Sequence, residues 1–192
     1  ELDKESDESK NKDLSIIREK LNHLDQIAGR ILDFGKSRES FRRNYSLQEI
    51  LKDASLLMRL KLEQSQVILI TNELPQEILV FVDKGQIQQA LLNLVLNALG
   101  AMPNGGEWSI QSSVNSLNRA EILVRDTGNG IPEDLREQIF DSFLTARTDG
   151  TGLGLTISKR ILRSHDGDLE LLESGENGTC LLYTSPSPRD NT

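Results

Sequence analysis

A long amphipathic helix is the strongest local pattern in this chain of 192 residues, and it spans residues 83–102. Apolar side chains recur there at spacings of three and four, and the segment stops at the turn sequence PNGG. Asn93 and Asn97 lie one turn apart, away from the apolar stripe. Such a helix covers another layer with its apolar face, while its amides face solvent or a cleft. The stripe consists of Ile87, Ala90, Leu91, Leu94, Ala98 and Met102.

Around this helix, short segments rich in β-branched and aromatic residues alternate with turn residues. Further helices are predicted from Ser46, where Glu49 completes capping-box spacing, from Pro132 as a short helix, and over residues 152–164. This order predicts an α+β fold, a two-layer sandwich in which helices cover one face of a mixed sheet. The predicted strands are residues 66–74, 78–83, 107–114 and 120–126, with two more at the end of the chain.

The first part of the chain has a different pattern. Between residues 14 and 31, apolar positions alternate at spacings of three and four, which is typical of a helical bundle or coiled coil. A lone helix of this length is marginal in water, so we predict a homodimer through this N-terminal helix. His23 lies among polar neighbours and is interpreted as a solvated helix residue. The apolar positions are Leu14, Ile17, Leu21, Leu24, Ala28 and Ile31.

Charge and cysteine content argue against several classes of function. The chain has 30 acidic and 22 basic residues, and its net charge of −8 repels nucleic-acid backbones and anionic membranes. The single cysteine, Cys180, cannot form an intramolecular disulfide and suits a reducing cytosol. No apolar run approaches the roughly 18 residues of a membrane-spanning helix. We therefore expect a cytoplasmic segment without a nucleic-acid partner or membrane contact, and a membrane anchor elsewhere in a full-length protein stays open.

Two glycine-rich loops bear on how the asparagines are interpreted. In DTGNGIP, residues 126–132, a strand ends at Asp126 and runs into glycines that let the backbone approach a ligand closely. In GTGLGL, residues 150–155, a loop opens a helix whose N-terminal amides can hold phosphates. Each loop alone is also an ordinary turn, and GTGLGL matches neither a P-loop nor a dinucleotide-binding fingerprint.

Four motifs occur in a fixed order: the asparagine helix, DTGNGIP, IFDSFLTAR at residues 139–147, and GTGLGL. In this order they resemble the catalytic, ATP-binding domain of sensor histidine kinases of the nitrogen-regulator type. These kinases belong to the superfamily of gyrase, Hsp90 and MutL ATPases, which share the Bergerat-type fold. The resemblance covers residues 46–183 and implies ATP held between helices and a flexible lid. Residues 1–45 then contain a partial dimerisation helix, similar to the second helix of the phosphoacceptor bundle, and residues 184–192 are a tail without an assigned function.

The resemblance also implies roles for individual residues. Asn97 would bind Mg²⁺ through its amide oxygen, and Asn93 would be the catalytic amide beside the phosphates. Asp126 would accept a hydrogen bond from the adenine amino group. The other implied nucleotide contacts are Gly128, Gly130 and Thr179 at the adenine, Arg147 at the phosphates, and Gly150, Thr151, Gly152, Leu153 and Gly154 in the phosphate-facing lid.

The expected function is transfer of the γ-phosphoryl group of ATP to a histidine on a helix outside this chain. An aspartate of a response-regulator receiver domain would then accept it. We expect ATP and Mg²⁺ as cofactors, because every nucleotide motif is present. The chain has no phosphoacceptor motif, so the accepting histidine is expected on a helix outside it. His165 lies just after the last predicted helix, where a side chain that can carry a positive charge suits the C-terminus. Two alternatives stay open. One is an ATPase of the same superfamily, in which a glutamate at the position of Asn93 would activate water, and the neutral amide of Asn93 argues against it. The other is a non-catalytic nucleotide-sensing scaffold that dimerises.

Overall fold

The computed structural model describes residues 40–72, 77–116, 119–144 and 152–185. All of them belong to a compact unit that begins at Ser40. The predicted bundle helix and His23 therefore lie outside the described residues. The compact unit starts before the predicted domain boundary at residue 46, because the strand β1 (Arg43–Ser46) pairs within it.

A mixed five-stranded sheet forms one layer, with the strand order β2-β4-β5-β7-β6. The edge strand β2 runs parallel to β4, and the other neighbours are antiparallel. A separate antiparallel ribbon joins β1 to β3. The strand bounds are β2 (Val67–Thr71), β3 (Leu79–Val82), β4 (Gly106–Val114), β5 (Ala120–Asp126), β6 (Asp168–Gly175) and β7 (Gly178–Thr184).

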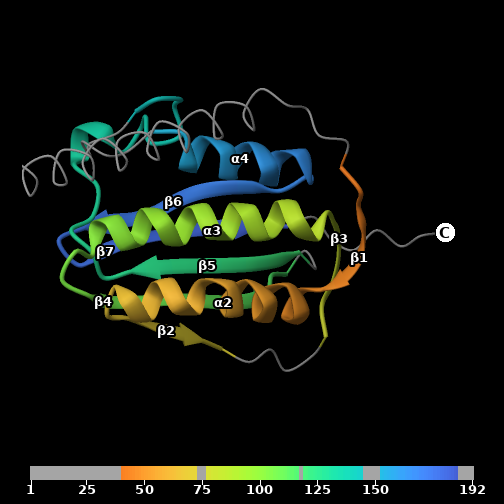
Figure 1. The fold of residues 1–192 in the computed structure, drawn as a ribbon. Helices are drawn as coiled ribbons and strands as arrows, with labels where there is room; N and C mark the ends of the chain where they lie inside the picture. Colours follow the sequence, from red (N-terminus) through yellow and green to blue (C-terminus); the bar gives the residue numbers. More distant parts are fainter. Residues whose placement is uncertain (1–39, 73–76, 117–118, 145–151, 186–192) are drawn as a thin grey trace, which may run out of the picture. The chain divides into compact units, whose positions relative to one another are not determined.

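Three α-helices of the described residues lie side by side over one face of this sheet (Figure 1). They are α2 (Leu47–Gln64), α3 (Lys84–Ala101) and α4 (Gly154–Ser164). Alternation along β5 points its even-numbered residues toward the helices, so Ile122 and Val124 are buried. The core between the layers also contains Trp108, the single tryptophan, which is fully buried. This arrangement confirms the predicted α+β sandwich.

The start of α2 differs from the predicted capping box. Ser46 precedes the helix, but its side chain makes no cap hydrogen bond. Its hydroxyl donates to Oε1 of Gln48 instead, and the same oxygen accepts from the amide of Ile78 at 3.2 Å. The prediction that Ser46 and Glu49 form a capping box is therefore wrong, because the hydroxyl of Ser46 bonds the side chain of Gln48 and no helix amide.

Three smaller differences concern the ends of elements. The helix predicted from Pro132 is a 3-10 helix of three residues, η1 (Glu133–Leu135). The helix predicted over residues 152–164 begins at Gly154. The last strand extends to Thr184, and the amide of Ser185 donates to the carbonyl of Ala120 at 2.7 Å. Among the described helices, none has the length and apolar character needed to cross a bilayer.

Candidate nucleotide site

Asp126 lies at the end of β5, facing the helices, and it is only 8 % exposed. Its Oδ1 accepts hydrogen bonds from the amides of Gly128 at 2.9 Å and Thr179 at 3.2 Å. Its Oδ2 accepts none from any residue that the structure describes. Burial raises the pKa of this carboxyl, and the two amide bonds partly oppose the shift. The structure thus orients a buried acceptor by one oxygen and leaves the other oxygen for a ligand.

The DTGNGIP loop is attached to the β6–β7 hairpin by side-chain hydrogen bonds. The amide of Ile131 donates to Oγ of Ser174 at 2.7 Å. That hydroxyl lies 3.1 Å from Oγ1 of Thr179, which is the predicted adenine contact. Ser174 was not identified from the sequence, because a serine near the end of a strand carries no signal for a partner 43 residues away. Thr179 is therefore fixed by both its amide and its hydroxyl beside Asp126.

Glycines let this loop approach the end of α3. A Cβ on Gly128 would lie 2.7 Å from Cβ of Ala101, closer than real contacts allow. The amide of Asn129 donates to the carbonyl of Ala101 at 3.1 Å. Gly130 has φ +69°, in the left-handed region that favours glycine. The predicted loop glycines thus bring Asp126 and the C-terminal end of α3 together.

The two asparagines of α3 have different environments. Asn93 is half-buried, and its Nδ2 is buried without a hydrogen-bond partner in the described part of the chain. Its Oδ1 accepts a long bond of 3.4 Å from Nε2 of Gln89. An unpaired buried amide costs about 1–3 kcal/mol. Asn93 therefore has an unused donor that a ligand can satisfy.

Asn97 is exposed and lies against the start of α4. A Cβ on Gly154 would come within 3.3 Å of both Oδ1 and Nδ2 of Asn97. The helices are also tied by the hydroxyl of Ser158, which donates to the carbonyl of Ala90 at 3.2 Å. Residues 57 positions apart, 97 and 154, thus meet where the glycine loop leads into α4. The structure therefore places Asn97, the predicted metal ligand, beside Gly154, a predicted lid residue.

At the N-terminus of α4 no side chain of the described residues makes a cap hydrogen bond, and amides at a helix start are suited to bind an anion. Gly152 precedes it with φ +64°, and its carbonyl accepts from the amide of Phe143 at 3.1 Å. Leu153 is only 1 % exposed as a whole residue, so it offers a nucleotide almost no surface. The remaining predicted lid residues, Arg147, Gly150 and Thr151, lie outside the described residues.

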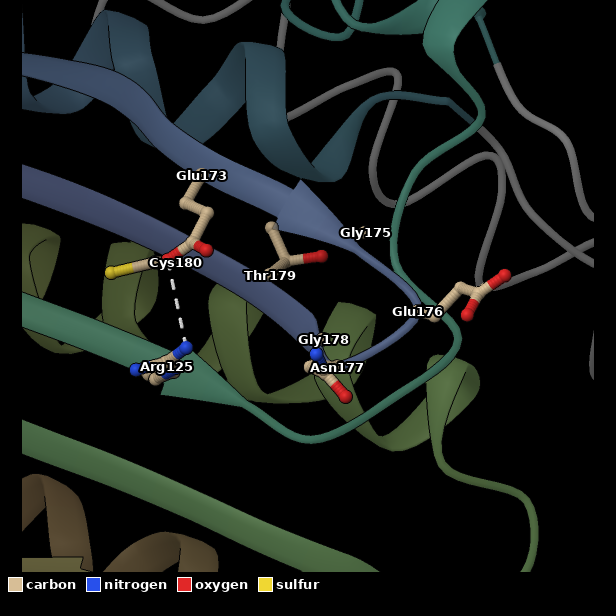
Figure 2. A pocket seen from close by; sticks show the side chains of 8 residues that line it. All are labelled: Arg125, Glu173, Gly175, Glu176, Asn177, Gly178, Thr179 and Cys180. Atoms are coloured by element: carbon tan, nitrogen blue, oxygen red, sulfur yellow. Dashed lines mark ion pairs between the residues drawn. The ribbon is translucent and has the colours of Figure 1, made fainter.

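A small hollow of about 50 Å³ lies beside this site but on the other face of the sheet. Figure 2 shows Arg125, Glu173 and Cys180 pointing to the same side of the strands, with the helices behind them. Arg125 and Glu173 form an ion pair at 3.5 Å above Cys180. The hollow is too small for a nucleotide. Burial raises the pKa of the Cys180 thiol, which favours its uncharged form. The arrangement of free polar atoms therefore places the candidate site on the helix side.

Asn97 is suited to Mg²⁺ through its amide oxygen, a hard ligand. Among the described residues, no group of three His, Cys, Asp or Glu side chains could form a cage for a metal ion. Mg²⁺ is often held by one or two protein oxygens together with substrate phosphates. The residues present fit that kind of site, because Asn97 adjoins the N-terminus of α4.

Comparison with known proteins agrees with this geometry. Residues 82–189 match the family described as histidine kinase-, DNA gyrase B-, and HSP90-like ATPase. The signal transduction histidine-protein kinase AtoS of Escherichia coli is 31 % identical over 93 % of this chain and 29 % of its own length. Sporulation kinase C of Bacillus subtilis is 30 % identical over 92 % of this chain and 41 % of its own length. The chain thus spans less than half the length of these curated relatives.

Solved structures resemble the fold as well. The catalytic domain of histidine kinase ThkA superposes with a TM-score of 0.67 and 30 % identity, covering 76 % of this chain and 95 % of that domain. ThkA in complex with the response regulator protein TrrA superposes with a TM-score of 0.76 and 28 % identity, covering 92 % of this chain and 51 % of that chain. The resemblance to sensor histidine kinase catalytic domains is thereby confirmed. The chain belongs to the family of histidine kinase-, DNA gyrase B- and HSP90-like ATPases.

Proposed function

We propose that this chain is the catalytic part of a sensor histidine kinase, which transfers the γ-phosphoryl group of ATP to a histidine on another helix. The observation that carries the proposal is a pair of unused polar atoms. Oδ2 of Asp126 is a free acceptor, and Nδ2 of Asn93 is a buried donor without a partner among the described residues. A ligand that satisfies both needs an amino group at one end and oxygens at the other. ATP has the adenine amino group and the phosphates in these places.

Each residue has a defined task in this proposal. Asp126 accepts from the adenine amino group and thereby orients the base, while the first-turn amides of α4 and Nδ2 of Asn93 hold phosphate oxygens. Phosphoryl transfer depends chiefly on such positioning and on charge neutralisation. Asn93 carries a neutral amide that cannot take a proton from water. This favours transfer to an incoming acceptor over hydrolysis of ATP, the reaction of the related ATPases.

Bound Mg²⁺ would neutralise charge on the phosphates, and Asn97 would contribute its Oδ1. Replacing Asn97 with alanine is expected to remove the Mg²⁺-dependent part of ATP affinity, by about 10- to 100-fold, because the ligand oxygen is lost. The fold should remain intact, since Asn97 is exposed. Calorimetric titration with ATP, with and without Mg²⁺, measures the effect. Asn44→Ala, an exposed asparagine on β1, is the matched control.

An Asn97→Ala protein that unfolds, yet binds Mg-ATP normally per folded molecule, would show that Asn97 is structural. If a folded Asn97→Ala protein kept the same Mg²⁺ dependence of its ATP affinity, other groups would hold the metal ion.

The partners follow from the same proposal. A relative in the solved structures, ThkA, is bound to a response regulator protein, which supports a receiver domain as the final acceptor here. A homodimer through the N-terminal helix is proposed from the apolar seam of residues 14–31. We also propose that this segment works in the cytoplasm, where ATP and reduced thiols are available.

Phosphotransfer is the direct test. The chain alone, incubated with γ-labelled ATP, is expected to give no phosphohistidine, because its sequence contains no phosphoacceptor motif that would hold a nitrogen in line with the phosphate. Positioning of this kind is worth about 7–11 kcal/mol in favourable systems. Adding a fragment that carries the first bundle helix of a related kinase should produce acid-labile, base-stable label on that helix. Adding a receiver domain should then move the label to an aspartate.

Other results would support the alternatives. Release of inorganic phosphate without labelling of the helix would identify an ATPase, and nucleotide binding with neither reaction would identify a scaffold. Label on His23 in the chain alone would contradict the proposed division of the chain.

A further inference from the structure

Three residues that precede β1 contact the ends of both helices of the nucleotide site. We name Ser40, Phe41 and Arg42 the N-terminal strap. The amide of Phe41 donates to Oδ2 of Asp83, the residue that caps α3, at 3.1 Å. Ser40 Oγ lies 3.3 Å from Nε2 of His165, the residue at the C-terminal end of α4. Figure 1 shows the segment leading into β1 at the end of the molecule where α3 begins and α4 ends.

Arg42 adds a charged contact to the same helix end. Its guanidinium forms an ion pair with Asp166 at 3.0 Å and also donates to the carbonyl of Ser164. Asp166 has φ +61°, a left-handed conformation that is uncommon for residues other than glycine. The strap therefore holds the turn after α4 as well as the cap of α3.

His165 is the common member of these contacts, and its side chain is fully buried. Its Nδ1 lies 2.7 Å from the carbonyl oxygen of Ile161, which can only accept, so Nδ1 carries a hydrogen. In the neutral ring, Nε2 is then an acceptor. It receives the amide of Asp83 at 3.1 Å and faces the hydroxyl of Ser40. One tautomer of the neutral imidazole thus joins α4, α3 and the strap.

A proton on Nε2 does not fit this arrangement. The new N–H would point at the amide N–H of Asp83, so two donors would face each other and their contact would break. The charged groups around the ring act in both directions, because Arg42 disfavours the cation while Asp83 and Asp166 favour it. Burial is the largest effect, and it lowers the pKa of His165 below its ordinary value near 6.5. His165 does follow the last helix, as predicted, but burial disfavours the cationic form that would suit this position.

We propose that neutral His165 is a positioning residue that couples the N-terminal strap to the helix pair α3 and α4, and that its protonation releases the strap. The coupling rests on the proposed function, because α3 and α4 carry the nucleotide site. A ligand that binds only when α3 and α4 are held together also stabilises the contacts of the strap. Because such coupling is reciprocal, the strap contacts increase the affinity for that ligand by the same factor. The strap contacts Asp83, the cap of α3, and α3 carries both Asn93 and Asn97.

The first experiment follows amide hydrogen exchange at Phe41 and Asp83 in the full chain between pH 5 and 8, with the imidazole titration followed by NMR. His165 binds a proton more tightly when the strap is released, because its pKa is lowered while the strap is in place. Protection is therefore complete above about pH 6.5 and falls as the pH drops toward the lowered pKa of His165. Exchange rates are corrected for their intrinsic pH dependence.

His165→Gln is the decisive variant, because its side-chain oxygen can accept from the amide of Asp83 but does not titrate. It keeps His23, so loss of the pH dependence assigns the effect to His165. Persistence of the dependence in His165→Gln, or simultaneous loss of protection throughout the sheet, would overturn the proposal. If His165→Gln fails to fold, Ser40→Ala tests the same contact, and unchanged exchange at Phe41 in that variant would count against it.

The second experiment tests the coupling to the nucleotide site. Saturating Mg-ATP is expected to slow exchange at Phe41 about five-fold or more, and Arg42→Ala should weaken ATP binding by a similar factor. Arg59→Ala, which removes an exposed ion pair on α2, is the matched control. ATP binding that leaves the strap unchanged would overturn the coupling. If the parent chain bound no ATP, the proposed function would fail, and the pH series would still decide whether His165 holds the strap.

Discussion

Replacing Asp126 with asparagine is expected to lower ATP affinity by about 10- to 150-fold while the fold remains intact. Asn Oδ1 can still accept from the amides of Gly128 and Thr179, which keeps the loop in place. The NH₂ group, however, replaces Oδ2 and would face the adenine amino group, so an acceptor is exchanged for a second donor. Hydrogen bonds to charged groups contribute about 1.5–3 kcal/mol, which corresponds to this range.

The same change should affect GTP differently. Guanine carries a carbonyl oxygen where adenine carries its amino group, so the amide of the variant can donate to it. We expect the preference for ATP over GTP to disappear in Asp126→Asn, with little loss for GTP. Calorimetry with both nucleotides measures this preference, and the fluorescence of Trp108, whose strand position is paired with Asp126, gives a second readout.

Asp134→Ala removes an exposed carboxylate from η1 and is the control for a general effect of charge. Equal affinities for ATP and GTP in the parent chain would show that Asp126 does not recognise adenine. An Asp126→Asn protein that binds both nucleotides normally would lead to the same conclusion.

Replacing Gly178 with alanine is expected to destabilise the domain by about 2–6 kcal/mol. Gly178 begins β7 with φ +108°, and a Cβ there would overlap the backbone carbonyl of Asp126. The cost combines backbone strain of about 1–3 kcal/mol with a similar cost of overpacking. A domain of this size is stabilised by only about 5–15 kcal/mol. The midpoint of urea unfolding should therefore fall substantially.

Gly175→Ala is a close control for this prediction. Gly175 lies at the other end of the same hairpin, and a Cβ there would meet nothing within 4 Å. Its replacement should change stability little. If both alanine variants unfold at the same urea concentration as the parent, the close approach of β7 to Asp126 is not as the structure shows. If Gly178→Ala is stable but loses ATP binding, the strand has shifted without unfolding.

Several features could be predicted from the sequence because they depend on local patterns. The helix of residues 83–102 was predicted from its spacing of apolar residues, and α3 occupies Lys84–Ala101. The strand before DTGNGIP was predicted from alternation and turn residues, and β5 ends at Asp126. Such signals lie within a window of a few residues, so no tertiary contact is needed to read them.

Other assignments failed because distant segments compete with local preferences. Ser46 and Glu49 have the spacing of a capping box. The hydroxyl of Ser46, however, donates to Oε1 of Gln48, which also accepts from the amide of Ile78. His165 follows a helix end, where a side chain that can carry a positive charge was expected. The approach of Asp83 and the strap buries the ring, and burial lowers its pKa. Contacts far along the chain act in both places: Ile78 bonds the Gln48 oxygen that accepts from Ser46, and Asp83 bonds the ring of His165.

The sequence alone therefore determined the kinds of elements, their order and the residue types available for nucleotide chemistry, because periodicity and turn chemistry are local. Tertiary structure alone decided what those residues meet. Asn93 and Asn97 look equivalent on the helix, yet packing leaves a buried donor on Asn93 and places Asn97 against Gly154. Gly178 acquires its importance only where β7 passes the carbonyl of Asp126. These differences arise from contacts between segments more than 50 residues apart, which no local pattern of side chains encodes.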